Sequence, residues 1–291
     1  MFDSLAELID APEPVFAPLA LDPLMAKLAE RAGFKAVYLG GGGLGYSKTF
    51  LEANLDLSQL AQAGVEIGAA TSLPVILDGA CGWGEAMHLR RTVAVAESAG
   101  FAAIEIEDQV YPKRAGHHVG DDLTIPPAAM AAKVRSAVEA RRDQRFLVIA
   151  RTDVAKADPE EAVRRSLAYR EAGADVLVPV VGNIGDPQVI VAVGERLGPP
   201  LMFLCPPGGL AHVGLSAAEM HAAGYRILVD AMSLHIRVYE SLAAGYAQLA
   251  DGFAIDAERP NQEWWDALAD LHETIDLEAL LEIERREAGD G

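Results

Sequence analysis

Charged side chains stand at the ends of apolar segments in this sequence, where they are costly unless they are paired or bind a ligand. Asp78 ends the segment PVILD, Glu105 and Glu107 lie in AIEIE, and Arg151 ends VIAR. Alternation along a strand places the two glutamates on the same side. If these segments are neighbouring strands, their carboxylates converge into an all-oxygen set that suits Mg²⁺ or Mn²⁺. The arginine is then placed to hold a substrate carboxylate with two hydrogen bonds. Helix capping or a structural salt bridge is the alternative for the acids.

Two further stretches are suited to binding or activating a small anion. The glycine run Gly40–Gly43 lets backbone N–H groups approach a carboxylate or phosphate closely, and a flexible turn is the alternative. The polar stretch 111–122 contains Lys113, Arg114 and two adjacent histidines that begin at His117. This composition is typical of an active-site lid that supplies charge and a general acid or base. A solvated surface loop is the alternative.

Composition excludes several classes of protein. The 291 residues include 24 Lys+Arg and 43 Asp+Glu, a formal net charge of −19, which disfavours nucleic acid and anionic membranes as partners. Hydrophobic residues make up 51%, typical of a globular protein. Two cysteines form no disulfide framework, and neither a secretory signal nor a long apolar run is present. We therefore expect a soluble cytoplasmic protein.

Short apolar segments alternate with amphipathic ones along most of the chain. The predicted strands are Val15–Ala20, Ala36–Gly41, Pro74–Gly79, Ala103–Asp108, Phe146–Thr152, Val176–Val181, Leu201–Pro206 and Arg226–Ala231. Eight strands, each followed by a helical pattern, favour a (β/α)₈ TIM barrel over residues 1–250, with the reacting groups at the carboxyl ends of the strands. Residues 251–291 form a helical extension. Its helical stretch, Gln262–Arg286, contains Trp264 and Trp265, which we expect to pack on the barrel or on a neighbouring subunit.

Several motifs at these strand ends resemble the isocitrate lyase/phosphoenolpyruvate mutase superfamily. They are AGFKAVYLGGG, PVILDGACGWG, AIEIEDQVYPKRAGHH and VIARTD. The resemblance covers most of the chain. It implies a (β/α)₈ barrel whose C-terminal helix is swapped between subunits, usually in tetramers, so a homo-oligomer is expected. It also implies Mg²⁺ near Asp78 and Glu107, with Mn²⁺ as a possible substitute.

The resemblance also implies roles for the other groups at the barrel mouth. A 2-oxo or 2-hydroxy acid would chelate the metal, and its carboxylate would be held by Arg151 and by the glycine run, here Gly40, Gly41 and Gly42. Tyr38 matches the aromatic residue beside the reacting centre, a tyrosine implicated in proton transfer in the lyases. The Lys113-Arg114 pair and His117 match the lid, and Lys113 and His117 are the preferred proton donors.

The sequence departs from the family pattern at five places. The second aspartate of the DxD motif is Ala80, and the lid cysteine of the lyases is Ala115. A glutamate after the sixth strand aligns with Val180, and an asparagine–threonine pair after the seventh aligns with Leu204 and Pro206. We therefore expect the part of the substrate beyond the oxoacid group to be hydrophobic or small, and we do not expect isocitrate or methylisocitrate to be the substrate.

Some positions are left open by the sequence. The family's third acid after the second strand is either Glu52 or Asp56. Cys81 and Cys205 both follow strands at the predicted mouth, where either might replace a missing acid in contacting substrate or fill space as a small apolar residue.

The leading hypothesis is a Mg²⁺-dependent lyase that cleaves a carbon–carbon bond of a 2-oxo or 2-hydroxy acid through an enolate. The alternatives are an oxaloacetate-type decarboxylase or hydrolase, a C–P bond enzyme of the same superfamily, and a non-catalytic barrel that binds an oxoacid.

Overall fold

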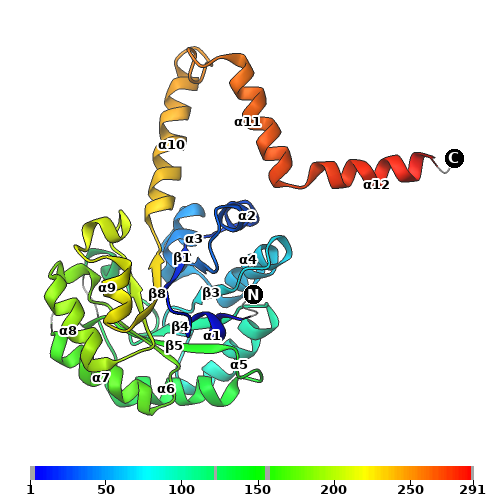
Figure 1. Ribbon diagram of the computed structural model, residues 1–291. Helices are drawn as coiled ribbons and strands as arrows, with labels where there is room; N and C mark the ends of the chain where they lie inside the picture. The colour runs from blue at the N-terminus through cyan, green and yellow to red at the C-terminus, as the bar shows by residue number, and fades with distance from the viewer. Residues whose placement is uncertain (1–3, 121–122, 155–157, 290–291) are drawn as a thin grey trace. The chain divides into compact units, whose positions relative to one another are not determined.

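A closed ring of parallel strands forms the centre of the computed structural model, which describes residues 4–120, 123–154 and 158–289 (Figure 1). The eight strands are β1 (Val15–Pro18), β2 (Val37–Leu39), β3 (Val75–Asp78), β4 (Ala103–Glu107), β5 (Leu147–Thr152), β6 (Val176–Pro179), β7 (Leu201–Leu204) and β8 (Tyr225–Asp230). Their order is β1-β8-β7-β6-β5-β4-β3-β2, and a parallel bridge between Leu19 and Tyr38 brings the first two strands together. The predicted (β/α)₈ barrel and the position of every predicted strand are confirmed.

Strand register determines which charged residues become neighbours. Parallel pairing places Asp78 of β3 beside Glu105 of β4, and Glu107 of β4 beside Arg151 of β5. Apart from β1, where Phe16 is exposed, the strands are almost entirely buried, as their nearly continuous Val, Ile and Leu content predicts. Three carboxylates and one guanidinium therefore meet at one end of a rigid sheet.

Helices cover the outside of the barrel (Figure 1). They are α2 (Pro23–Arg31), α4 (Leu57–Ala70), α5 (Ala86–Ser98), α6 (Pro127–Ala140), α7 (Pro159–Glu171), α8 (Pro187–Leu197) and α9 (Ala217–Ala222), and α10 (Ser233–Ala250) follows β8. Local signals fix their ends. The Asp158 carboxylate accepts a hydrogen bond from the Glu161 N–H at the start of α7, and Gly173 has a φ of 103° just beyond its end.

Three elements differ from the sequence prediction. The glycine run begins a helix, α3 (Gly41–Ser47), and is not a turn, and a short helix α1 (Leu5–Leu8) precedes the first strand. The predicted helical stretch 262–286 consists of two helices, α11 (Asn261–Thr274) and α12 (Leu277–Gly289). They are separated at Asp276, whose φ of 58° lies in the left-handed region.

The chain divides into two compact units, residues 1–235 and 236–291. The division falls inside α10, whereas the sequence analysis placed the end of the barrel domain at residue 250. Several large apolar side chains of the second unit are exposed, among them Tyr246 and Trp265. Trp264 is one-third exposed, and the Arg259 guanidinium lies over its ring, 4.2 Å from the ring centroid. Within the part of the chain that the structure describes, no helix is long and apolar enough to span a membrane.

Candidate active site

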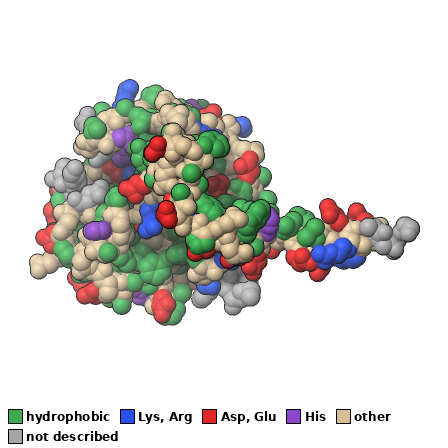
Figure 2. Space-filling model, turned by 90° about the horizontal axis from the view of Figure 1, so that it is seen from above, with side chains coloured by type: hydrophobic (Ala, Val, Ile, Leu, Met, Phe, Trp, Pro, Cys, Tyr) green, Lys and Arg blue, Asp and Glu red, His purple; other side chains and the backbone are tan. Residues whose placement is uncertain are grey.

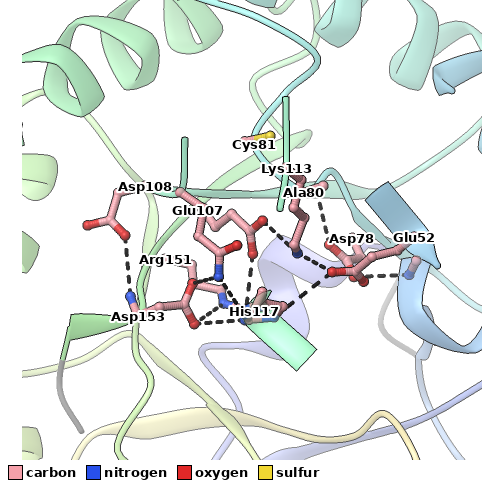
Figure 3. Close-up of polar contacts among 12 residues, drawn as sticks. Glu52, Asp78, Ala80, Cys81, Glu107, Asp108, Lys113, His117, Arg151 and Asp153 are labelled. Carbon is pink, nitrogen blue, oxygen red and sulfur yellow. Dashed lines mark hydrogen bonds and ion pairs between the residues drawn. The ribbon is translucent and has the colours of Figure 1, made fainter. Parts of the chain in front are cut away.

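Arg151 lies at the centre of a group of buried carboxylates at the carboxyl ends of β3, β4 and β5 (Figure 3). Its Nη1 donates to Glu105 Oε1 over 2.9 Å, and its Nε and Nη2 donate to Asp153 Oδ1 over 3.1 and 2.8 Å. Nη2 also lies 3.6 Å from Glu107 Oε2. All four side chains are buried. The arginine is thus held in one orientation by three buried carboxyl groups. The sequence analysis expects it to bind a substrate carboxylate, and that expectation remains a prediction.

A second buried cation, Lys113, lies between two of the acids. Its Nζ is 2.7 Å from Glu107 Oε1 and also pairs with Glu52. Burial alone would lower the pKa of Lys113, but Glu107 and Glu52 raise it well above its usual value, so the amine stays protonated. Of the two acids that the sequence left open, Glu52 is therefore the one that lies in this cluster. Asp56 instead caps α4 by accepting a hydrogen bond from the Gln59 N–H.

Tyr38 lies at the bottom of the site and is held by Glu105. The phenol donates a 3.3 Å hydrogen bond to Glu105 Oε2, and both side chains are almost completely buried. Burial and the nearby Asp78 raise the pKa of Tyr38 well above its usual value, so its hydroxyl keeps its proton. Burial also raises the pKa of Glu105 to about 8, although Arg151 acts in the opposite direction. Glu105 therefore connects the tyrosine to the arginine.

The first turn of α3 approaches the site closely, but one of its N–H groups is already used. The Gly41 N–H donates to Asp78 Oδ2 over 3.0 Å, and the Ala80 N–H donates to Oδ1 of the same carboxylate over 3.0 Å. Gly40 and Gly42 line the cavity. Gly45 explains why glycine is needed in this helix, because a Cβ there would lie 2.8 Å from the Phe50 carbonyl oxygen.

The acids have the chemistry of a magnesium site. Neither Glu107 oxygen accepts a hydrogen bond of good geometry from the described residues, and Lys113 and Arg151 reach this carboxylate only as ion pairs. Within those residues no three His, Cys, Asp or Glu side chains are already arranged around a common centre. Mg²⁺ commonly uses one or two carboxylates and keeps several waters, so Asp78, Glu107 and Glu52 fit it through direct and water-mediated bonds.

The predicted lid is described up to Gly120; residues 121–122 lie outside the described part. A 3₁₀ helix (Ala115–Val119) holds the two histidines. His117 Nδ1 is 2.6 Å from Gln109 Nε2, and His118 Nδ1 is 3.0 Å from the Tyr46 hydroxyl. Arg114 is exposed and is not among the residues that line the cavity. Lys113 and His117 thus reach the site, whereas Arg114 does not.

A cavity of about 600 Å³ opens above these groups, and its lining has two chemically different parts. Its charged part comes from β2 to β5 and the segments that follow them, and includes Glu52, Asp78, His117, Arg151 and Asp153. Its apolar part follows β6, β7 and β8 and includes Val180, Leu204, Cys205, Pro206, Pro207 and Met232. Cys81 is buried outside this lining, with its thiol pKa raised to about 11 by burial, and does not face the cavity.

Three contributors were not among the site residues predicted from the sequence. Glu105 was recognised only as sharing a side with Glu107, two residues later on the same strand, and that alternation was the available signal. Asp153 follows Arg151 with the same spacing and supports it. Gln109 donates to Asp153 over 3.1 Å and reaches His117, contacts that depend on the fold of the lid.

Outside the site, acidic side chains are scattered over the face shown in Figure 2 and are not gathered into one patch.

A TIM barrel with a buried arginine and a carboxylate cluster at the carboxyl ends of its strands has the architecture of an enzyme whose active site lies at the barrel mouth. The chain belongs to the family described as phosphoenolpyruvate phosphomutase, whose model matches residues 5–250. It is 45% identical over 227 residues to 2-methylisocitrate lyase of Aeropyrum pernix, covering 77% of this chain and 72% of that protein. It is 35% identical over 231 residues to 2,3-dimethylmalate lyase of Eubacterium barkeri, covering 77% and 78%.

Solved structures agree with this assignment. The crystal structure of phosphonopyruvate hydrolase in complex with oxalate and Mg²⁺ superposes with a TM-score of 0.82 at 28% identity, covering 97% of both chains. The resemblance to the isocitrate lyase/phosphoenolpyruvate mutase superfamily is confirmed, and so is an enzyme of the carbon–carbon lyase type.

Proposed function

We propose that this enzyme cleaves a carbon–carbon bond of a 2-oxo or 2-hydroxy carboxylic acid through an enolate, with Mg²⁺ as its cofactor. The observation that supports this most directly is Arg151, buried and oriented by Glu105 and Asp153 while lining the cavity. A guanidinium in this position is suited to a carboxylate ligand. The oxalate and Mg²⁺ complex of the related phosphonopyruvate hydrolase supports the same ligand chemistry.

Each side chain of the site has its own role in a retro-aldol cleavage. A carboxylate of the site accepts the proton of the substrate hydroxyl, and the hydroxyl oxygen becomes a carbonyl oxygen as the carbon–carbon bond breaks. The electron pair of that bond stays on the fragment whose own carbonyl group stabilises it as an enolate, and an acid of the site then gives this enolate a proton. Arg151 would hold the carboxylate, while Asp78, Glu107 and Glu52 would hold the metal. When bound, Mg²⁺ stabilises negative charge on the substrate oxygens.

Two side chains of the site keep their protons, and a third group reaches the cavity from the lid. The Tyr38 hydroxyl and the Lys113 ammonium both keep their protons because their pKa values are raised. His117 lines the cavity from the lid. Ala115 occupies the position of the lid cysteine of the lyases, and its role as proton donor falls to Lys113 or His117. Tyr38 would lie beside the reacting carbon.

Thermal unfolding with and without Mg²⁺ and oxalate or pyruvate tests the oxoacid site. We expect stabilisation that needs both components and is absent in Arg151→Ala, since a bound ligand stabilises the folded state by mass action. The matched control is Arg165→Ala, which removes a buried arginine that pairs with Asp108 and lies outside the cavity lining. No shift with any oxoacid would contradict the proposal.

Product analysis separates the enzyme from its alternatives. Metabolite pools incubated with the protein should release pyruvate or glyoxylate in a Mg²⁺-dependent manner. Release of CO₂ alone would favour a decarboxylase. Binding without any product would favour the non-catalytic barrel. Turnover of isocitrate or 2-methylisocitrate at the rate of a dedicated lyase would show that the losses at Ala80 and Ala115 do not exclude those substrates.

Self-association through the second unit is part of the proposal. Tyr239, Tyr246, Phe253 and Trp265 each have at least 60% of their surface exposed. Such a concentration of aromatic surface is typical of a protein interface. Light scattering on the full chain should give a mass at least twice 30.9 kDa, and a mass of one chain would contradict self-association.

A further inference from the structure

We propose that the substrate carries an uncharged alkyl group beyond its oxoacid part, seated on the apolar wall formed after β6, β7 and β8, and that this wall excludes a second carboxylate. This inference rests on the proposed function, because it takes the oxoacid part to lie at Arg151. The wall is defined by Val180, Leu204, Cys205, Pro206 and Met232.

The wall is a fixed surface. The Val180 N–H donates to the Thr152 carbonyl over 3.1 Å, and the Cys205 N–H donates to the Val229 carbonyl over 2.8 Å, so strand-like hydrogen bonds hold the backbone on both sides. Val180 and Leu204 are half-buried, with one part against the core and the remainder in the cavity. Burial of a ligand's methyl and methylene groups against such a surface lowers the free energy of binding.

Cys205 adds no charge to this wall. Burial and the neighbouring Asp230 raise the pKa of its thiol to about 12, so the thiol stays neutral. It therefore contributes a small apolar surface and is neither a nucleophile nor a replacement for a lost acid.

A second carboxylate would find few partners at this wall. Of the cavity-lining residues that the structure describes, Arg151 is the only Lys or Arg, and the proposed function already assigns it to the carboxylate of the oxoacid part. Burial lowers the pKa of His118, which keeps that ring neutral. Asp230 lies close enough to raise the Cys205 pKa and would repel an added anion. A dicarboxylate tail would thus lose its hydration without gaining a counter-charge.

Calorimetric titration with 2-oxo acids in the presence of Mg²⁺ tests the proposal. Pyruvate, 2-oxobutyrate and 2-oxovalerate share the oxoacid group and lengthen the alkyl tail by one methylene at a time. We expect Kd to fall about fourfold per methylene. Oxaloacetate and 2-oxoglutarate, which end in a carboxylate, should bind at least tenfold more weakly than the alkyl acids of similar length.

A charge placed on the wall should reverse this preference. Leu204→Arg should tighten 2-oxoglutarate at least tenfold relative to 2-oxovalerate, whereas Val65→Arg, an exposed site on α4 outside the lining, should leave the ratio unchanged. Val180→Ser is the milder second variant if Leu204→Arg does not fold, and should flatten the dependence on tail length. Arg151-dependent pyruvate binding with no gain along the alkyl series, or with tighter binding of the dicarboxylates, would overturn this inference but leave the proposed function intact. Absence of binding by every acid would overturn both.

Discussion

The two halves of the barrel mouth differ in chemistry: one is charged and the other is apolar. After β2 to β5, charged side chains are buried and held by counter-charges or N–H groups, as Arg151 is by Glu105 and Asp153. After β6 to β8, the exposed wall is apolar, with Val180 and Leu204 at positions facing the cavity. Both halves stand on the same sheet, so the difference lies only in the residues at the strand ends. A fixed polar half suits the part of the substrate where bonds change, and an apolar half suits the part that distinguishes one substrate from another.

Two adjacent acids in the polar half, Glu107 at the end of β4 and Asp108 just beyond it, also differ in their contacts. Asp108, next to Glu107, accepts hydrogen bonds from Thr152, Tyr169 and Arg165 over 2.6, 2.7 and 2.9 Å. Glu107 accepts none of good geometry from the described residues. Both carboxylates are buried, yet one joins strand to helix and the other remains available to a ligand. For this pair, the number of hydrogen bonds accepted, and not burial, distinguishes Asp108 from Glu107.

Removal of Arg151 should have the largest effect. Arg151→Ala leaves Glu105, Glu107 and Asp153 without their shared counter-ion, which should cost about 3 to 5 kcal/mol of unfolding free energy. Turnover should fall by about 10³-fold because the carboxylate of the substrate loses its anchor. Arg165→Ala should cost on the order of 3 kcal/mol but keep the oxalate Kd within about twofold. Equal loss of oxalate binding in the two variants, measured by calorimetry, would contradict the division between site and scaffold.

Much of the fold could be predicted because each signal was local. Alternating apolar and amphipathic segments gave all eight strands, and a cap such as Asp158 fixed a helix end to within a residue. The glycine run is an exception: the alternative interpretation of a flexible turn is wrong, because the run begins the helix α3. Close packing restricts side chains in this helix, since a Cβ at Gly43 would lie 3.2 Å from Leu21 Cδ2, and the sequence pattern around the glycine run does not reveal this contact with a distant segment.

Individual residues of the site could be predicted from the sequence, whereas most contacts between them could not. Asp78, Glu107 and Arg151 were found because a charge at the end of an apolar strand is unusual. The choice of Glu52 over Asp56 depends on which of them a buried lysine reaches, and the link from Tyr38 to Glu105 spans two strands that are not neighbours in the sheet. Such contacts require the closed barrel and leave no trace in the spacing of residues.

Lys113 offers the next largest effect. Lys113→Met should lower turnover by about 10²-fold, because the site loses a positioned acid. The same change leaves Glu52 and Glu107 without their shared cation, so Mn²⁺ should bind more tightly, which electron paramagnetic resonance titration measures. The control is Lys133→Met, a buried lysine that instead donates to the Cys81 carbonyl. Weaker Mn²⁺ binding in Lys113→Met than in Lys133→Met would show that the ammonium does not compete with a metal.

Glu105 should act through its neighbours. Glu105→Gln keeps one oxygen acceptor but replaces the other carboxyl oxygen, so either Tyr38 or Arg151 loses its partner, and kcat should fall about 10- to 100-fold with little change in KM. Tyr38→Phe removes the partner of the same hydrogen bond. If Glu105 positions the tyrosine, the double variant should be less impaired than the product of the two single effects. Fully multiplicative losses would place Glu105 outside the Tyr38 pathway.

The smallest effect concerns pH and needs no substrate. Burial raises the pKa of Glu105 to about 8 and that of Glu107 to about 7, from an ordinary value of 4.5. The folded state therefore holds protons that the unfolded chain has released between about pH 4.5 and 8, so the unfolding free energy should fall as pH rises through this window. One such group contributes at most ~1.4 kcal/mol per pH unit.

Urea unfolding in EDTA should show a shallower decline for Glu105→Gln than for the unaltered chain, while Asp56→Asn, an exposed cap, should leave the slope in this window unchanged. An equally steep decline in Glu105→Gln would mean that this carboxyl is already ionised in the folded protein, held so by Arg151, and that the polar half of the mouth carries its full charge at neutral pH.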